Sequence, residues 1–536
     1  MAKPKLALIP AAQGDKFYSV LPSDGVGDFD FTRNSSATRI APTGFIQEVG
    51  AFGSELVTNG NFDNNSDWSL GSGWSISGGN AVGVTASGNL QQNIGVIASK
   101  QYKLTFNVTA YTSGSLSVDL GGSSAQTTSG VGLKTFNFTT TSTGNLRFYG
   151  GSFSGSIDNV SVIQVIGNQS RLNYDLLNGK VVNCPHYLLE PASTNSVTYS
   201  ENFSQWQLIG ITVTSNSLIS PDGSLNASKL VATSGSSNKV IAQGITANTY
   251  TASVFAKKGG FEGLFIGTGT TGAFFNLNTY AYRTHYVNPP TSFKIENYGN
   301  GWYRYSITFT QSANDNFYIG VNDNVSNTLA VTGNGTSGIY TFGAQLEALT
   351  YPTSYIPTNG TAITRAAESA TGSGDAATFN DSEGVLMAEI SALSDDLTFR
   401  NITISDGSNS NIIQLRYRST SNVLQALLYV GGVGETYGVT LNDIKTFSKT
   451  ALKYKENDVS FWVNGFEIVV DTSASTFPNN TLNTLRFERG DGAFDFYGKT
   501  REVQYFDSAL TDAQLETLTS WTSLQEMITS QLYTNY

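Results

Sequence analysis

The sequence predicts an all-β protein built from several domains. Its 536 residues are enough for about three or four domains of roughly 150 residues. Only 13% of the residues are charged, whereas 12% are aromatic and 55 are glycine. This composition is unlike that of helical proteins, and its aromatic side chains can bury enough area to oppose disorder. Segments such as 102–108 (YKLTFNV) alternate polar and apolar residues, which indicates half-buried antiparallel strands.

Charge and the rarest residues exclude several classes of function. The net charge is −11, and no basic cluster is longer than Lys257-Lys258, so a nucleic-acid partner is not expected. One cysteine, Cys184, and two histidines, His186 and His285, argue against a disulfide framework, a zinc site and Cys-His catalysis.

Neither a membrane span nor a signal peptide is predicted. No run of residues approaches the roughly 18 apolar residues that a spanning helix needs. The apolar stretch within residues 1–12 (MAKPKLALIPAA) is short and is broken by Pro10. We therefore expect synthesis in a cytoplasm without Sec processing, from which the chain leaves, if it does, as part of an assembly. Membrane insertion is not expected.

Composition shifts divide the chain into seven segments. Residues 1–52 predict one or two hairpins too small to hold a core alone, which suits a docking segment. The blocks at 53–167 and 197–368 each open with Asn-Phe and then a tryptophan, a weak internal repeat. The remaining segments are a return segment at 168–196, a linker at 369–382, a third β-rich region at 383–519 and a helical tail at 520–536.

Helical patterns are confined to the end of the sequence. Residues 508–518 predict a short helix with Thr511 as N-cap and with Leu515 and Leu518 on one face. A second amphipathic stretch, Trp521 to Tyr533, has apolar residues at three- and four-residue spacing.

Two parts of the sequence resemble known domain families. The text from 453 (KYKENDVSFWVNGFEIVVDTS) to the ALTDAQLETL stretch at 509–518 resembles a concanavalin-like, or laminin-G-like, sandwich. The block at 53–167, with NGNFD and a closing IDNVSV, is similar to carbohydrate-binding jelly rolls. The resemblances imply two jelly-roll β-sandwiches plus a concanavalin-like β-sandwich, followed by a short C-terminal helix.

A discontinuous set of segments resembles a fibre or adhesin family of tailed-phage virions, crAss-like and marine phages among them. The segments are LPSDGVGDFDFTRNSSATRI with GFIQEV, then RLNY, CPHYLLEPASTNSVTYSENFSQW and GAQLEALTYPTSYIPTNGTAITRAAES. In that family GFIQEV and RLNY lie close together, so residues 53–167 are expected to be an insertion whose two ends are neighbours.

The resemblance implies a fibre or adhesin subunit, of the head or the tail, that binds host surface polysaccharide from the virion surface. Expected partners are other virion proteins and two further copies of this chain in a homotrimer. Two alternatives stay open. One is a decoration protein without glycan binding, and the other is a polysaccharide-degrading enzyme.

Glycan binding needs exposed aromatic rings beside amides or carboxylates. The candidates are Trp68, Trp74, Tyr111 and Tyr149 in the first block and Trp206, Phe261, Tyr280, Tyr282 and Trp302 in the second. Trp302 opens a strongly apolar strand, which favours a core position. For Trp74, beside turn glycines, binding and burial are both open.

No cofactor is expected apart from structural calcium, which such jelly rolls often hold. By the resemblance, Asn61 with Asp158 and Glu201 with Glu347 would supply the oxygen ligands, although solvated carboxylates explain these residues equally well. Residues 406–411 (DGSNSN) lack the distal Glu of an EF-hand.

Catalysis is not expected. The neighbouring acidic pairs, Glu502 with Asp507 and Glu488 with Asp491, match no glycanase strand motif.

Overall fold

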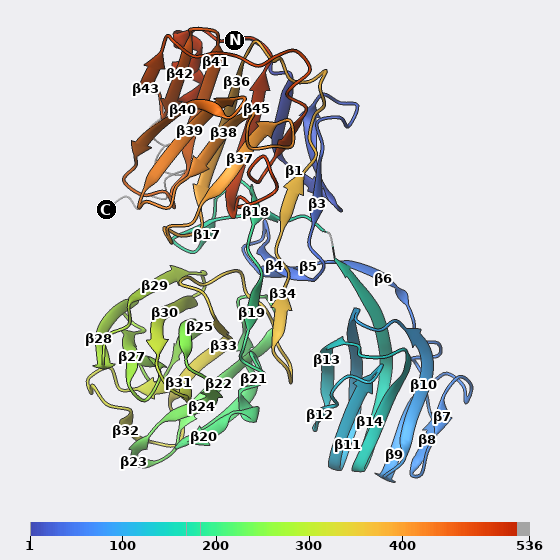
Figure 1. The fold of residues 1–536 in the computed structure, drawn as a ribbon. Helices are drawn as coiled ribbons and strands as arrows, with labels where there is room; N and C mark the ends of the chain where they lie inside the picture. The colour runs from blue at the N-terminus through green and yellow to red at the C-terminus, as the bar shows by residue number, and fades with distance from the viewer. Residues whose placement is uncertain (1, 168, 183, 522–536) are drawn as a thin grey trace.

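The structure confirms an all-β, multidomain chain. A computed structural model describes residues 2–167, 169–182 and 184–521 (Figure 1). Within these residues the helices are α1 (Asp512–Thr519) and one short 3-10 turn, η1 (Phe203–Gln205). Three β-sandwich bodies form. We name them the first module (53–167), the second module (197–368) and the base sandwich, whose strands come from the rest of the described chain, including the return segment 168–196. The two modules lie side by side at one end of the base sandwich (Figure 1).

The base sandwich packs a large sheet against a small one over a shared core. The large sheet runs in the order β35 (Ser369–Thr371), β3 (Phe29–Thr32), β2 (Lys16–Leu21), β1 (Leu6–Gln13), β45 (Gly498–Phe506), β36 (Glu383–Ala392), β41 (Ser448–Lys455), β42 (Val459–Val463) and β43 (Phe466–Asp471), with β18 (His186–Leu189) on β45 and β15 (Leu172–Asn173) on β18. The small sheet runs β40 (Val433–Thr440), β39 (Val423–Val430), β38 (Ile412–Tyr417), β37 (Arg400–Ser405) and β44 (Thr484–Arg486).

This sheet order corrects two of the predicted boundaries. Residues 1–52 are not a separate docking segment, because β1 pairs directly with β45 and places Leu6 opposite Tyr505. Phe17 of the same segment is fully buried in the core of the base sandwich. Residues 369–382 are not a linker, since β35 pairs with β3 and Phe379 packs into that core. The base is therefore assembled from segments at both ends and in the middle of the chain.

Helix α1 confirms the predicted C-terminal helix. Thr511 is its N-cap and forms a capping box with Gln514. Leu515 and Leu518 pack on the outer face of the large sheet, beside Met387. Of the second predicted amphipathic stretch, only Trp521 belongs to the described residues, and the rest of the predicted tail lies outside them. No helix in the described ranges is long and apolar enough to cross a membrane.

The first module wraps around two long strands that pass through both of its layers. Its strands are β6 (Ala51–Glu55), β7 (Ser69–Leu70), β8 (Trp74–Ser77), β9 (Asn80–Ala86), β10 (Asn89–Val96), β11 (Gln101–Leu120), β12 (Gln126–Thr128), β13 (Gly132–Thr139) and β14 (Gly144–Gly167). Period-two alternation drives them, as in β10, where buried and more exposed residues alternate along the strand.

The two ends of the first module are neighbours, as an insertion requires. Strand β6 pairs with the end of β14, which places Phe52 opposite Val165. Gly167 closes the module with φ +69°, and a Cβ there would lie 2.3 Å from the backbone oxygen of Arg33. Only glycine suits that conformation and that close approach.

The second module is a sandwich of two six-stranded sheets around one core. One sheet runs β20 (Gln207–Ile209), β24 (Val240–Ile245), β31 (Asp315–Asn322), β26 (Gly263–Gly267), β27 (Thr271–Asn276) and β28 (Ala281–Val287). The other runs β21 (Ile211–Ile219), β22 (Leu225–Ala232), β33 (Gly338–Glu347), β25 (Asn248–Gly259), β30 (Tyr303–Gln311) and β29 (Ser292–Asn297), and β23 (Gly235–Asn238) pairs with β32 (Ala330–Gly333) outside both sheets.

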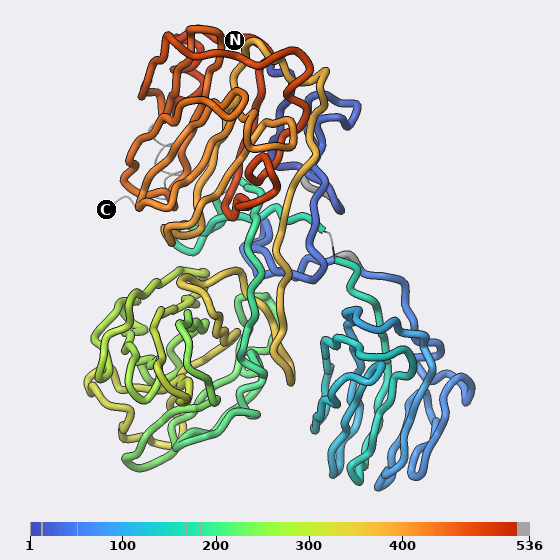
Figure 2. Tube along the Cα trace, in the orientation of Figure 1, coloured from blue at the N-terminus to red at the C-terminus, as the bar shows by residue number. Residues whose placement is uncertain are grey.

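Short ladders connect the three bodies. Strands β19 (Ser193–Asn195) and β34 (Ile363–Arg365) pair as the chain enters and leaves the second module, and Figure 2 shows these two stretches running side by side. Hairpin β4 (Ala37–Ile40) with β5 (Ile46–Val49) lies where the bodies meet, and β16 (Leu176–Leu177) pairs with β17 (Lys180–Val181).

Candidate functional site

A polar sheet face surrounds Tyr149 on the first module. Tyr149 and Arg147 alternate along β14 with the buried residues Phe148 and Leu146. The register places Asp119 of β11 and Gln91 of β10 opposite Arg147, and Ser117 and Asn89 opposite Tyr149. Alternation turns all six residues to the same side of the sheet. We call this set the Tyr149 face: Asn89, Gln91, Ser117, Asp119, Arg147 and Tyr149.

Hydrogen bonds fix the centre of the Tyr149 face. The Arg147 guanidinium donates to both carboxylate oxygens of Asp119, from Nε at 3.0 Å and from Nη2 at 2.7 Å. The Tyr149 hydroxyl donates to the same carboxylate. The guanidinium also lies 5.2 Å from the centre of the Tyr149 ring. The three side chains therefore hold one another in a single arrangement, which suits binding without reorganisation.

The Tyr149 hydroxyl is neutral near neutral pH. Burial and the hydrogen bond to Asp119 raise the pKa of Tyr149 to about 12, so the phenol stays protonated. The Arg147–Asp119 pair is close to neutral as a unit. The face therefore offers a ring, amides and hydroxyls with little net charge, a combination that suits sugar hydroxyls and the apolar faces of sugar rings.

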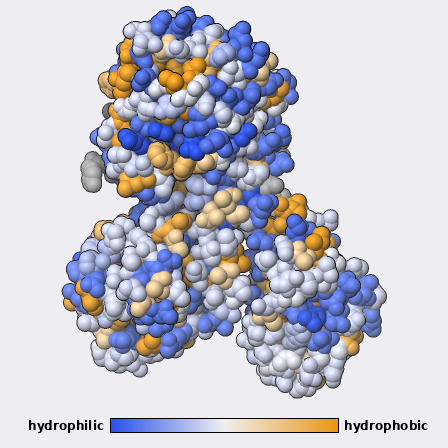
Figure 3. Space-filling view, viewed as in Figure 1, coloured by the Kyte–Doolittle hydropathy of each residue, from blue (hydrophilic) through white to orange (hydrophobic). Residues whose placement is uncertain are grey.

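Short residues flank Tyr149 on the side away from Arg147. The next outward row holds Gly151 on β14 and Ser115 on β11, which pair with each other. A Cβ at Gly151 would lie 2.5 Å from the Ser115 hydroxyl. The two residues are therefore tightly packed, and their short side chains rise little above the sheet. In the space-filling view the free end of the first module is mainly white and blue, and hydrophobic residues gather near the base (Figure 3).

The three tryptophans among the leading candidates are buried, which corrects their expected role as exposed stacking platforms. Trp68, Trp74 and Trp206 are 6%, 7% and 5% exposed, and each belongs to a module core. Each indole N–H donates to a backbone oxygen, that of Asn59, Gly88 and Tyr199 respectively. Burying a large ring with its N–H satisfied is the favourable arrangement for tryptophan in a small sandwich.

The other aromatic candidates divide between core and surface. Trp302 is 3% exposed, as its apolar strand predicted, and Phe261 packs against the second core. Tyr111 is 37% exposed but lies six residues from Ser117 along β11, outside the Tyr149 face. Tyr280 and Tyr282 lie at the edge of the second module, and each stacks on another ring.

The candidate calcium ligands all have protein partners. Asn61 donates to Asp63 at 2.6 Å, and Asp158 accepts from the backbone N–H of Asn159. Glu201 accepts from the Tyr355 hydroxyl at 2.9 Å, whereas Glu347 accepts from Ser193 at 2.7 Å. In the described ranges, no three His, Cys, Asp or Glu side chains group together as metal ligands. Calcium binding at these residues stays a prediction.

Three of the four acidic residues that were weighed for catalysis bond to their own neighbours. Glu488 binds Arg486 at 2.8 Å, and Asp491 binds Arg489 at 2.6 Å. Glu502 accepts from Gln504 on its own strand.

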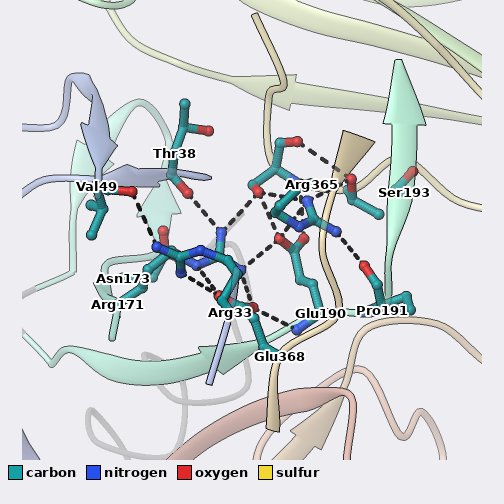
Figure 4. Close-up of polar contacts among 12 residues, drawn as sticks. Arg33, Thr38, Val49, Arg171, Asn173, Glu190, Pro191, Ser193, Arg365 and Glu368 are labelled. Atoms are coloured by element: carbon teal, nitrogen blue, oxygen red, sulfur yellow. Dashed lines mark hydrogen bonds and ion pairs between the residues drawn. The ribbon is translucent and has the colours of Figure 1, made fainter. Parts of the chain in front are cut away.

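Five buried charges form a hub that the sequence patterns did not single out. We call them the arginine hub: Arg33, Arg171, Arg365, Glu190 and Glu368 (Figure 4). Glu368 accepts from Arg33 at 2.7 Å and from Arg171 at 2.8 Å. Glu190 accepts from Arg171 at 2.8 Å and lies 2.9 Å from Arg365. All five side chains are at most 3% exposed, so the hub is a structural junction and not a ligand site.

Burial and the neighbouring charges shift the pKa of three residues of the arginine hub. Burial acts to raise the pKa of Glu190, but Arg365 and Arg171 lower it to about 2. Burial acts to lower the pKa of Arg171, yet Glu368 and Glu190 raise it above its ordinary value. Burial lowers the pKa of Arg33 to about 10 despite the charge of Glu368. Glu190, Arg171 and Arg33 are therefore charged at neutral pH.

The hub residues lie in the segments that carry the discontinuous resemblance. Arg33 belongs to FTRNSS, Arg171 to RLNY and Glu190 to YLLEP, and the last two members belong to TRAAES. The sequence signal that could have found them was the recurrence of single charged residues within otherwise apolar or small-residue segments.

Comparisons with known proteins give partial likenesses to solved structures. Neither protein-family models nor curated protein sequences match this chain. The CBM40 of a Ruminococcus gnavus IT-sialidase bound to α2,3-sialyllactose is 16% identical, with 26% of this chain and 84% of that chain covered and a TM-score of 0.23. Domain 4 of an extracellular GH43 arabinanase from Geobacillus stearothermophilus is 13% identical, with 29% and 73% covered and a TM-score of 0.24. A SAP-like pentraxin from Limulus polyphemus is 11% identical, with 27% and 72% covered and a TM-score of 0.22.

Proposed function

We propose that this chain is a fibre or adhesin subunit on the surface of a tailed-phage virion and that its first module binds host surface glycans. The observation that carries the glycan-binding part is the Tyr149 face. One tyrosine ring there is held in place by Arg147 and Asp119 and is flanked by amides and a hydroxyl.

Chemistry supports a sugar ligand at this face. Sugar rings present apolar C–H faces that stack on aromatic rings, and their hydroxyls need donors and acceptors nearby. Asp119 and Arg147 neutralise each other, so a neutral sugar meets no unpaired charge when it displaces water. We expect binding without bond cleavage.

The virion part of the proposal rests on the segments that resemble the phage fibre family. Those segments converge on the arginine hub, so they build the junction from which the modules are displayed. Other virion proteins and a homotrimer are the partners that this role requires. Several copies on one particle would raise avidity by about 10²- to 10⁴-fold over a single weak site.

The test is binding of the labelled full chain to an array of bacterial capsular and O-antigen polysaccharides. Tyr149→Ala should weaken binding by roughly threefold to tenfold, because a ring contact is worth about 0.5–1.5 kcal/mol. Tyr18→Ala is the matched control, since Tyr18 is 40% exposed but lies on the base. Unchanged binding by Tyr149→Ala, with binding by the unmodified chain, would remove the Tyr149 face from the proposal.

The burial of the three tryptophans favours one second candidate, a decoration protein that binds no glycan. In that case the unmodified chain binds no array member, and loss of the protein lowers particle stability but not adsorption. Release of reducing ends from a bound polysaccharide would instead support the degrading enzyme.

A further inference from the structure

Four aromatic side chains lie together at one edge of the second module. They are Tyr280, Tyr282, Phe293 and Tyr303, which we call the aromatic quartet. Tyr280 ends the turn between β27 and β28, and Tyr282 lies on β28, the edge strand of one sheet. Phe293 lies on β29, the edge strand of the other sheet, and Tyr303 begins the neighbouring strand β30. The quartet therefore spans the gap between the two sheets.

The quartet consists of two parallel ring pairs. Tyr280 stacks on Tyr303 with 3.9 Å between ring centres and 14° between planes. Tyr282 stacks on Phe293 at 4.5 Å and 12°. Beneath them the fully buried Phe275 meets Tyr282 and Phe293 edge to face. Phe275 thus supports the Tyr282–Phe293 pair from the core side.

One ring of each pair remains exposed to solvent. Tyr280 is 39% exposed and Phe293 is 49% exposed, whereas their partners are half-buried. At these fractions, rings of the usual size offer roughly 130–220 Å² between them. A stable protein interface needs about 800 Å² on each partner, so the quartet fits a small ligand better than a protein.

The chemistry of the quartet matches a sugar ring. Three of its four members carry a phenol hydroxyl at the rim of the ring, and none is charged. Asn297 donates to the Tyr303 hydroxyl at 3.0 Å, and Asn278, two residues before Tyr280, accepts from Lys258 at 2.7 Å. Stacking on the ring faces with hydrogen bonds at the rim is the combination that recognises a pyranose.

We propose that the aromatic quartet is a second carbohydrate site, which takes the apolar face of a neutral pyranose by stacking on Tyr280 or Phe293. This inference takes its ligand class, a carbohydrate, from the proposed function and depends on it in no other respect. The two sites differ in chemistry, because the Tyr149 face offers one ring among polar groups and the quartet offers paired rings. One chain would then hold a polysaccharide at two points, which raises its effective affinity.

The test uses the full chain and the same polysaccharide array, extended with neutral gluco-, xylo- and galacto-hexasaccharides. Tyr280→Ala combined with Phe293→Ala should weaken binding by roughly threefold to tenfold. Tyr280→Trp, which keeps a stacking ring, should retain binding. Phe466→Ala is the matched control, since Phe466 is 71% exposed on the base sandwich. Thermal unfolding of each variant separates loss of a site from loss of the fold.

The outcomes distinguish the two sites. If the double variant binds as the unmodified chain does while Tyr149→Ala weakens binding, the quartet is not a site and the proposed function stands. If only the double variant weakens binding, the quartet stands and the Tyr149 face fails. If the unmodified chain binds nothing on the array, both proposals fail. Self-association that the double variant abolishes, without any change in glycan binding, would also overturn the inference.

Discussion

Glu201 is a carboxylic acid whose ionisation the fold opposes. It lies where the second module meets hairpin β4–β5, and it accepts hydrogen bonds from Tyr355 and Asn226. Burial raises the pKa of Glu201 to about 7, the charges of Asp222 and Glu48 add to this effect, and the Tyr355 hydrogen bond opposes it. The folded chain thus keeps a proton that the unfolded chain releases above its ordinary pKa of 4.5. The free energy of unfolding should therefore fall as pH rises from about 4.5 to about 7, and this contribution should be flat above that window.

Glu201→Gln should remove this pH dependence. The Gln oxygen can accept from Asn226 as Glu201 does, and the new N–H can donate to the Tyr355 hydroxyl, which can donate to the Ser200 hydroxyl instead. We expect the variant to gain stability relative to the unmodified chain at pH 8 and to match it near pH 4.5. Thermal unfolding across pH 4.5–8 measures this difference. An unchanged slope in the variant would show that another group carries the effect.

Also at the scale of residues, the sequence indicates which aromatic side chains are candidates for binding but does not show which of them are buried. The alternation of Leu146 and Phe148 with Arg147 and Tyr149 is a local pattern that indicates an outward face for Tyr149. Trp68 and Trp206 follow polar, turn-rich text, and nothing local shows that their rings fold back onto the core. Their burial depends on contacts with Phe148 and Phe317, which lie 80 and 111 residues away.

At the scale of elements, sequence patterns predicted a helix or strand correctly where the residues that stabilise it are close together in the chain. The capping box at Thr511 needs only Gln514, so helix α1 was predictable. Strand β1 was predictable as a strand but not as a partner of β45, which lies almost 500 residues later. Antiparallel pairing at such separation leaves no periodic pattern in either segment, so the N-terminal strands were expected to form a small separate element.

The arginine hub ties these distant elements together, and its charges are mutually dependent. Glu368→Gln would leave Arg33 and Arg171 buried with one carboxylate fewer. We expect a loss of about 3–5 kcal/mol in the free energy of unfolding, the usual cost of removing one partner from a buried charge network. Asp491→Asn, in the more exposed pair with Arg489, is the control and should cost below about 1 kcal/mol. Urea unfolding measures both, and equal effects would show that the hub is not a stabilising junction.

At the scale of the whole molecule, the base joins both ends of the chain and displays the modules at one end. The N-terminus lies in the base at the end away from both modules (Figure 1). Lys103 of the first module pairs with Glu48 of the hairpin at 2.5 Å, and Asn359 of the second module donates to Thr135 of the first at 2.6 Å. Contacts between the modules are few beside those within each core. The insertion at 53–167 was predictable, because the resemblance is interrupted there, but the composite base was not.

This architecture predicts that deleting the N-terminal strands unfolds the base and that deleting the first module does not. Removing residues 2–50 takes three strands from the large sheet and leaves β45 paired on that side only with β18, without a partner for Val503 to Tyr505, so we expect no cooperative unfolding of the base. Replacing residues 53–167 with a short Gly-Ser linker should leave the rest folded, because β6 and the end of β14 already bring the two cut points together. The excised module, made alone, should unfold cooperatively, since its core is its own.

Far-UV circular dichroism and calorimetry of the three proteins test this. A stable base without residues 2–50 would restore the separate docking segment, and an unfolded excised module would mean that the first module needs its neighbours.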